Sequence, residues 1–150
     1  MPYIITNETF ALVPMGKKTK IIEREKIITI NETPAKVVSM NCIINGSSLE
    51  GRQKGSSYLI GTTYKPPIII NDSSNIVLLP THSIRNIECT WINLNSILIY
   101  VKNNDKTTIL EFKNKKKLNL KVSYTIFDKQ VLRATRLESS LRGRNNQKYL

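Results

Sequence analysis

The chain has 150 residues, of which 23 are Lys or Arg and 11 are Asp or Glu, so its formal net charge is +12. This length suits one domain of ordinary size, and 40% apolar residues with only six glycines and six prolines exclude a disordered chain. The longest uninterrupted apolar run, residues 97–101, is far shorter than the ~20 residues that span a membrane. Because no basic segment precedes a hydrophobic stretch at the N-terminus, we expect a soluble cytoplasmic protein that does not bind membranes and whose two cysteines stay reduced.

The first part of the chain is predicted to form β-strands. Residues 2–13 are typical of two short strands with a turn between them, and the Ile-rich residues 20–30 favour extended chain, although their charged centre could allow a helix. Residues 35–44 follow Pro34 and form a further predicted strand, which ends at the turn signal Asn45-Gly46.

A glycine-rich segment at residues 45–57 holds three of the six glycines. Each glycine would weaken a helix by about 1 kcal/mol, so a long ordered loop is predicted here. This loop carries Arg52 and Lys54, which could contact phosphates or enter a narrow minor groove. The alternative is a tight connection between strands. The glycine spacing lacks the order of a P-loop and does not predict a nucleotide site.

More strands are expected through the middle of the chain. They lie at residues 58–64, in a hairpin of 68–70 and 76–79, as one long or two short strands within 87–101, and in a hairpin of 107–112 and 118–122. The tip of the last hairpin, residues 113–117, is rich in lysine. Trp91 lies among apolar residues and is expected in the core, with stacking on a base as the alternative.

The C-terminal segment changes period and predicts an amphipathic helix. Apolar residues recur at spacings of 4, 3, 3 and 4, at Phe127, Val131, Ala134, Leu137 and Leu141. A capping box is expected at residues 125–128 and a stop at Gly143. The opposite face is basic, with Lys129, Arg133 and Arg136, and with Arg142 and Arg144 beyond the last predicted turn.

The positive charge is concentrated in the last third of the chain. Residues 102–150 carry thirteen basic and four acidic side chains, whereas residues 1–75 carry nine and six. A basic excess on one part of a domain favours a polyanionic ligand, above all nucleic acid. The alternatives are an acidic protein partner, an anionic membrane or a merely solvated face. No partner helix precedes the basic helix, so a helix-turn-helix reader is not predicted.

Residues suited to catalysis or metal binding are few. His82 is the only histidine, and with Cys42 and Cys89 it offers three dispersed candidate ligands without the paired spacing of a structural zinc site. We therefore expect no metal, no cofactor and no enzymatic activity. His82 is expected in an exposed loop, and both thiols are expected to be buried.

Five segments together resemble the competence transcription factor ComK family. They are CIINGSSLEGRQKG at 42–55, KPPI at 65–68, LPT at 79–81, CTWI at 89–92 and FDKQVLRATRL at 127–137. The resemblance covers roughly residues 35–145. It implies a bacterial activator of DNA-uptake genes that binds paired A/T-rich boxes as an oligomer, through the minor groove, and that meets RNA polymerase and an adaptor–protease system. Members of the family usually continue into a longer C-terminal tail, so a short member is expected.

The sequence thus predicts a mainly β (α+β) fold, an antiparallel-sheet or barrel-like domain over residues 1–145 with a C-terminal amphipathic helix and a frayed end at 146–150. The expected function is sequence-preferring binding of double-stranded A/T-rich DNA and activation of competence genes. Two alternatives are a short paralogue or truncated form acting by hetero-oligomerisation or competition, and an RNA-binding module. The expected DNA contacts are Arg52, Lys54, Lys115, Lys116, Lys117, Arg133, Arg136, Arg142 and Arg144.

Overall fold

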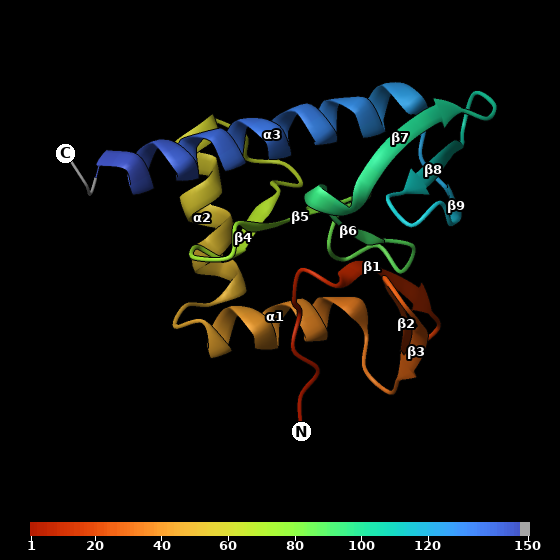
Figure 1. Ribbon diagram of the computed structural model, residues 1–150, viewed down its shortest axis with the longest axis horizontal. Coiled ribbons are helices and arrows are strands. Elements are labelled where there is room, and N and C mark those ends of the chain that lie inside the picture. Colours follow the sequence, from red (N-terminus) through yellow and green to blue (C-terminus); the bar gives the residue numbers. More distant parts are fainter. Residues whose placement is uncertain (148–150) are drawn as a thin grey trace.

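The computed structural model describes residues 1–147, with the side chains of residues 1–143, and it is an α+β fold (Figure 1). The strands are β1 (Thr9–Met15), β2 (Lys18–Glu23), β3 (Ile27–Ile30), β4 (Ile68–Asn71), β5 (Ile76–Pro80), β6 (Trp91–Asn93), β7 (Ile97–Lys102), β8 (Thr108–Phe112) and β9 (Lys117–Leu120). The helices are α1 (Pro34–Ile44), α2 (Leu49–Ile60) and α3 (Tyr124–Gln147), with a short 3₁₀-helix at Leu94–Ser96.

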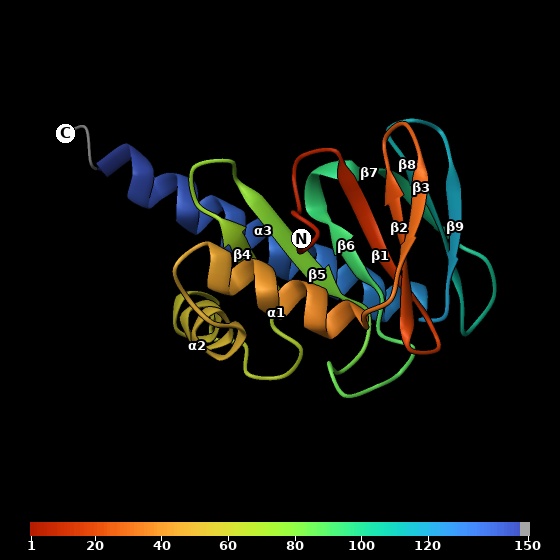
Figure 2. The ribbon, with the colours of Figure 1, turned by 90° about the horizontal axis from the view of Figure 1, so that it is seen from below.

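The strands form two antiparallel sheets. One has six strands in the order β3-β2-β1-β6-β5-β4, and the other has three in the order β7-β8-β9. Helix α1 covers one face of the six-stranded sheet, while α3 and the smaller sheet cover the other (Figures 1 and 2). Neither sheet closes on itself, so the predicted α+β class with a C-terminal helix is confirmed and the barrel-like variant is not formed.

Side chains of successive residues in the central strands enter two different cores. On β5, Val77 packs with the core under α3, whereas Leu78 packs with the core under α1. Trp91 and Ile92 on β6 divide in the same way, and Trp91 is only 1% exposed, which confirms its expected place in the core. Because both faces of this sheet are covered, its central strands are continuous apolar runs instead of alternating ones.

The predicted strand at residues 35–44 is wrong, because this segment is helix α1. The Thr33 hydroxyl accepts a hydrogen bond from the Lys36 amide at 3.4 Å, and Pro34 occupies the first turn, where it needs no amide hydrogen. Val38 and Cys42, four residues apart, are fully buried. Burial against the sheet thus outweighs the β-propensity of the valines and isoleucines.

The predicted loop at 45–57 and the predicted strand at 58–64 are also wrong, because most of this stretch is helix α2. The Ser48 hydroxyl caps its first turn by accepting from the Gly51 amide at 2.9 Å. Gly61, with φ +69°, ends it in a conformation that side chains with a Cβ rarely adopt. Ser56 and Ile60 are buried, so caps and packing stabilise the helix despite two internal glycines.

Most of the other predicted strands form with shifted boundaries, but the first one, within residues 2–13, does not. Residues 20–30 fall in the β2–β3 hairpin, and the middle hairpins are β4–β5 and β8–β9. Residues 3–5 form no strand; instead the side-chain amide of Asn41 bonds to both the Tyr3 carbonyl and the Ile5 amide.

The predicted C-terminal helix is confirmed as α3, and its apolar stripe is buried at Phe127, Ala134, Leu137 and Leu141. Its first turn is capped by the Ser123 hydroxyl, not by Thr125, and Gly143 does not end it. Of the segment expected to be frayed, residues 146–147 continue the helix and residues 148–150 lie outside the described residues.

Candidate nucleic-acid interface

Arg52 and Lys54, which the sequence analysis placed in a loop, lie on α2, and both form ion pairs. Arg52 is 18% exposed at its side chain, and its Nη1 donates to an Asp72 oxygen at 3.1 Å. The Nζ of Lys54 lies 3.2 Å from a Glu50 carboxylate oxygen, and both of those side chains are 78% exposed. Arg52 therefore links α2 to the β4–β5 turn. The contact of either residue with DNA stays a prediction.

The lysine-rich hairpin tip is exposed, as expected. Lys115, Lys116 and Lys117 are all exposed, and none forms an ion pair with a described residue. The tip is fixed to the β2–β3 turn, because the Asn114 side-chain amide donates to the Arg24 carbonyl at 2.9 Å. Three free cations are thus displayed on a turn that a tertiary hydrogen bond holds in place.

A second group of cations surrounds the middle of α3. Lys129, Arg133 and Arg136 line a depression of about 210 Å³ together with Thr62 from the α2–β4 connection. None of these cations has an ion-pair partner among the residues with described side chains. The predicted basic face of the helix is therefore present and uncompensated.

The remaining predicted contacts lie toward the end of α3. Arg142 is paired with Glu138 at 2.7 Å, although its side chain remains 59% exposed. The side chain of Arg144 lies outside the described residues. The other carboxylate on this helix, Asp128, accepts a short hydrogen bond of 2.6 Å from the Tyr100 hydroxyl. Burial, and next this bond to a carboxylate, raise the pKa of the Tyr100 hydroxyl well above its ordinary value.

The hairpin tip and the α3 cations lie near opposite edges of the six-stranded sheet. The tip contacts the β2–β3 turn after Glu23, opposite the start of β1. The α2–β4 connection ends at Ile68, opposite Leu78 in the middle of β5. Four strand spacings of about 4.8 Å separate β2 from β4, so the elements that carry the two basic regions are roughly 20 Å apart.

Lys65, which the sequence analysis did not choose as a contact, lies between two neighbouring hollows. One hollow, of about 500 Å³, is bordered by Lys54, Tyr64 and Lys65, and the other, of about 560 Å³, by Tyr64, Lys65 and Lys106. Burial, and next the nearby positive charge of Arg133, lower the pKa of the Lys65 ammonium. The Lys65 carbonyl and the Arg133 guanidinium both bond to the Gln130 side chain, at 3.0 and 2.9 Å, so these two basic residues are neighbours.

The residues considered for metal binding do not form a site. Cys42 and Cys89 are free and buried, and burial raises the pKa of each thiol to about 11. The partly exposed His82 donates from Nε2 to the Lys121 carbonyl at 3.0 Å and accepts at Nδ1 from the Thr81 hydroxyl at 2.8 Å. Within residues 1–147, no group of three or more His, Cys, Asp or Glu side chains could hold a metal ion.

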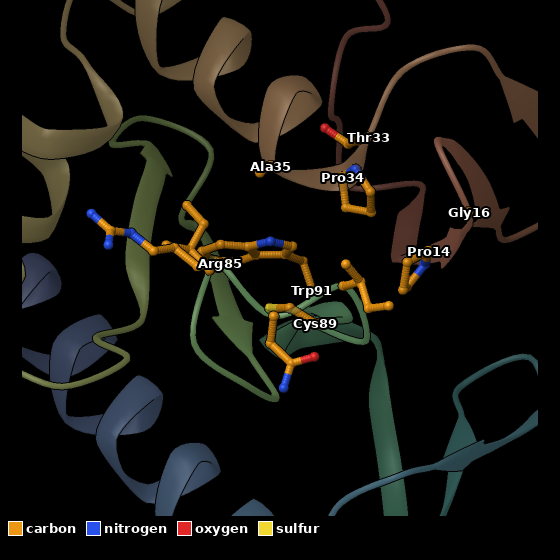
Figure 3. Close-up of a pocket in the computed structure, with 11 residues that line it drawn as sticks. Pro14, Gly16, Thr33, Pro34, Ala35, Arg85, Cys89 and Trp91 are labelled. Carbon is orange, nitrogen blue, oxygen red and sulfur yellow. The ribbon is translucent and has the colours of Figure 1, made fainter.

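A small cavity lies beside Trp91 on the α1 side of the sheet (Figure 3). It measures about 180 Å³, and its walls include Pro34, Cys89 and the Arg85 side chain. This cavity is mostly apolar and holds none of the free cations of the hairpin tip or of α3. It therefore does not belong to the candidate interface. Among the described helices, none is long and apolar enough to cross a membrane.

Comparison with known proteins bears on the identity of the chain. The profile of the ComK protein family matches residues 1–146. Over 146 residues the chain is 32% identical to the competence transcription factor of Bacillus subtilis (strain 168), and the match covers 95% of this chain and 76% of that relative. A LytTR DNA-binding domain of a methyl-accepting/DNA response regulator from Bacillus cereus has a TM-score of 0.43 and 14% identity, over 83% of this chain and 81% of that one. The first two findings confirm the resemblance drawn from the five motifs.

Proposed function

Because this chain belongs to the ComK family, a family of transcription factors and not of enzymes, we propose that it binds double-stranded DNA and activates competence genes from paired A/T-rich boxes. As the family resemblance implies, the proposal places it in the cytoplasm with RNA polymerase and an adaptor–protease system as partners. The contacts proposed for DNA are those expected from the sequence except Arg52, which is paired with Asp72 and is expected to be structural. The hairpin tip and the middle of α3 are the main contacts.

One observation carries this proposal: seven of the eleven acidic side chains form ion pairs away from the hairpin tip and the middle of α3. Glu8, Glu32, Glu50, Asp72, Glu88, Asp105 and Glu138 each form an ion pair with a lysine or arginine. The cations at the hairpin tip and in the middle of α3 have no such partner among the described residues. Cations that are free in the folded protein can displace the counterions of DNA phosphates, which drives association.

The preference for A/T-rich sequence has a physical basis in the shape of the duplex. A/T-rich tracts have a narrow minor groove with enhanced negative potential, which attracts arginine and lysine side chains. Arg133 and Arg136 are three residues apart on one helix, so they project from the same side. This supports insertion into, or alignment along, a minor groove.

A gel-shift series tests the proposal. The chain is titrated onto a duplex with paired A/T boxes and onto the same duplex with scrambled boxes, each at 50 and 200 mM salt. We expect tighter binding to the paired boxes at both salt concentrations and weaker binding at the higher one. Equal affinity for the two duplexes would contradict the sequence preference, and tighter binding to single-stranded RNA would favour the RNA-binding alternative. Arg133→Ala with Arg136→Ala should weaken binding and reduce its salt dependence.

The proposed oligomer has a candidate interface on β7. This strand is one edge of the three-stranded sheet, and Leu98, Ile99 and Val101 on it are 45–53% exposed. An exposed apolar edge strand offers unpaired backbone groups to a second copy of the same chain. Light scattering of Ile99→Lys should show a smaller species than the unmodified chain, and an unchanged mass would contradict this interface.

A further inference from the structure

We propose that Lys65, Gln130 and Arg133 form a preorganised site for one phosphate group, and that its occupant is a phosphodiester of bound duplex DNA. This inference rests on the proposed function and deepens it. It assigns one phosphate contact to the junction of the α2–β4 connection and α3, and it assigns Gln130 as a positioning residue.

Gln130 joins three parts of the chain at this junction. Its side chain is fully buried on α3. Its Nε2 donates to the Lys65 carbonyl at 3.0 Å and to the Pro80 carbonyl at 2.7 Å, while its Oε1 accepts from Arg133 Nη1 at 2.9 Å. One buried amide therefore fixes the loop that carries Lys65, the end of β5 and the guanidinium of Arg133.

The backbone at Lys65 is held in an uncommon conformation. Its φ of +50° lies in the left-handed region, which residues with a Cβ adopt only when their surroundings require it. The hydrogen bond from Gln130 to the Lys65 carbonyl helps to hold this conformation. The conformation sets the direction in which the Lys65 side chain leaves the loop, so this ammonium is positioned before any ligand arrives.

The charges around this junction are predominantly positive. The Lys65 Nζ contacts only neutral groups, the Thr81 carbonyl at 3.5 Å and the Tyr64 ring at 5.4 Å from its centroid. The carboxylates that line the adjoining hollows, Glu50 and Asp105, are paired with Lys54 and Lys102, respectively. Placing two uncompensated cations close together costs free energy in the unliganded protein, and an anion between them would remove that cost.

A phosphodiester suits these groups better than a carboxylate does. A guanidinium with one amino group engaged by Gln130 retains further N–H donors for phosphate oxygens, and an ammonium adds a compact charge. Lys129, Arg136 and Thr62 border the depression that Arg133 lines, whereas Lys65 borders the two neighbouring hollows, so these groups can contact successive phosphates of a strand. The arrangement fits a chain of phosphates that runs along α3.

The test measures binding of the A/T-box duplex by fluorescence anisotropy as a function of salt, for the full chain and its variants. Lys65→Gln and Arg133→Gln should each lower the slope of log K against log salt by about 0.9, which is the value of one phosphate contact, and weaken binding ~5- to 10-fold at 100 mM salt. The variant that combines Lys65→Gln with Arg133→Gln should lower the slope by about 0.9 in total, because both residues contact the same phosphate. Lys36→Gln is the matched control, because Lys36 lies on α1, on the opposite side of the sheet, and is already paired with Glu32.

Gln130→Met tests positioning at nearly constant volume. It leaves both charges in place, so we expect weaker binding with an unchanged circular dichroism spectrum, and Arg133→Lys should keep the salt slope but lose affinity. If Gln130→Met does not fold, the surface variants Lys65→Gln and Arg133→Gln still decide the question. If the salt slopes of Lys65→Gln and Arg133→Gln both equal that of Lys36→Gln, the proposed phosphate site is wrong, although the chain still binds DNA.

A second arm separates this site from the proposed function. Inorganic pyrophosphate should raise the melting temperature of the unmodified chain and of Lys36→Gln, but not that of Lys65→Gln. If the chain binds no duplex while pyrophosphate still discriminates these variants, the anion site exists but DNA is not its occupant. If pyrophosphate discriminates none of them and duplex binding is normal, the site is wrong and the function stands.

Discussion

Replacing Arg52 by Met distinguishes a structural arginine from one that contacts DNA. In the structure Arg52 Nη1 donates to Asp72 at 3.1 Å, and Nη2 lies 3.5 Å from the Asn45 carbonyl. With 18% of its side chain exposed, this pair is neither a surface salt bridge nor a fully buried one. Met keeps the apolar stem and removes the charge and all donors.

The expected loss of stability lies between two known limits. Exposed ion pairs contribute about 0–1 kcal/mol, and breaking a buried pair costs about 3–5 kcal/mol. The Nε of Arg52 is buried without a partner, so the native arrangement already carries a cost that Met removes. We therefore expect Arg52→Met to lower the free energy of unfolding by about 1–2 kcal/mol, which shifts the urea midpoint by roughly 0.5–1 M for a slope near 2 kcal/mol/M.

Urea unfolding followed by circular dichroism measures this shift, and salt-dependent DNA binding measures the other role. Lys54→Gln is the control, two residues along the same helix, because its ion pair is 78% exposed on both sides and should change stability by less than about 0.5 kcal/mol. If Arg52 is structural, Arg52→Met should lower the urea midpoint and leave the salt dependence of DNA binding unchanged. An unchanged midpoint together with a slope lowered by about 0.9 would refute the structural assignment and make Arg52 a DNA contact.

Three further predictions concern the stability of the fold. Trp91→Ala should cost about 3–5 kcal/mol in urea unfolding, because the ring is 1% exposed between sheet and α1; a loss below 1 kcal/mol would contradict this packing. Gly61→Ala should cost about 1–2 kcal/mol, since φ is +69° there, and an unchanged midpoint would show that α2 can end differently. The thiols of Cys42 and Cys89 should resist alkylation at pH 8 until urea unfolds the chain; labelling at the unfolded rate would contradict their burial. Burial raises the pKa of both thiols from 9 to about 11. The stability that the two thiols contribute is therefore full below pH 9 and is lost as the pH rises toward 11. Urea unfolding at pH 8 and at pH 10.5 would detect this loss.

Helix α3 was predictable because its signal is local. A single apolar stripe at helical spacing needs only one partner surface, and the structure supplies it in the core beneath the helix. Helix α1 carried a start signal as well, Thr33 followed by Pro34, but its content of valine and isoleucine favoured a strand. The four-residue spacing of the apolar residues Val38 and Cys42 is typical of a helix and favoured one here.

Helix α2 could not be predicted in this way. Its buried residues are only Ser56 and Ile60, so it has almost no apolar periodicity, and glycines occupy two of its internal positions. What stabilises it is a cap at each end and contact with β4 and with α3, which is distant in sequence. The same limit applies to the site. The partners of Arg52 and Lys65 lie 20 and 65 residues away, so the sequence predicts which side chains are charged but not which charges are already neutralised.

The positions of the cations that form no ion pair, more than the net charge, limit how this protein can bind DNA. Each ion pair cancels locally, since beyond about 10 Å at 0.1 M salt exposed charges are largely screened. The cations without an ion pair include two basic regions near opposite edges of the sheet, roughly 20 Å apart. Other cations, such as Lys17, Lys18, Lys20, Lys26, Arg85 and Lys106, also form no ion pair with a described residue. At 3.4 Å per base pair, one duplex that contacts both regions must run for about six base pairs or more along a single copy.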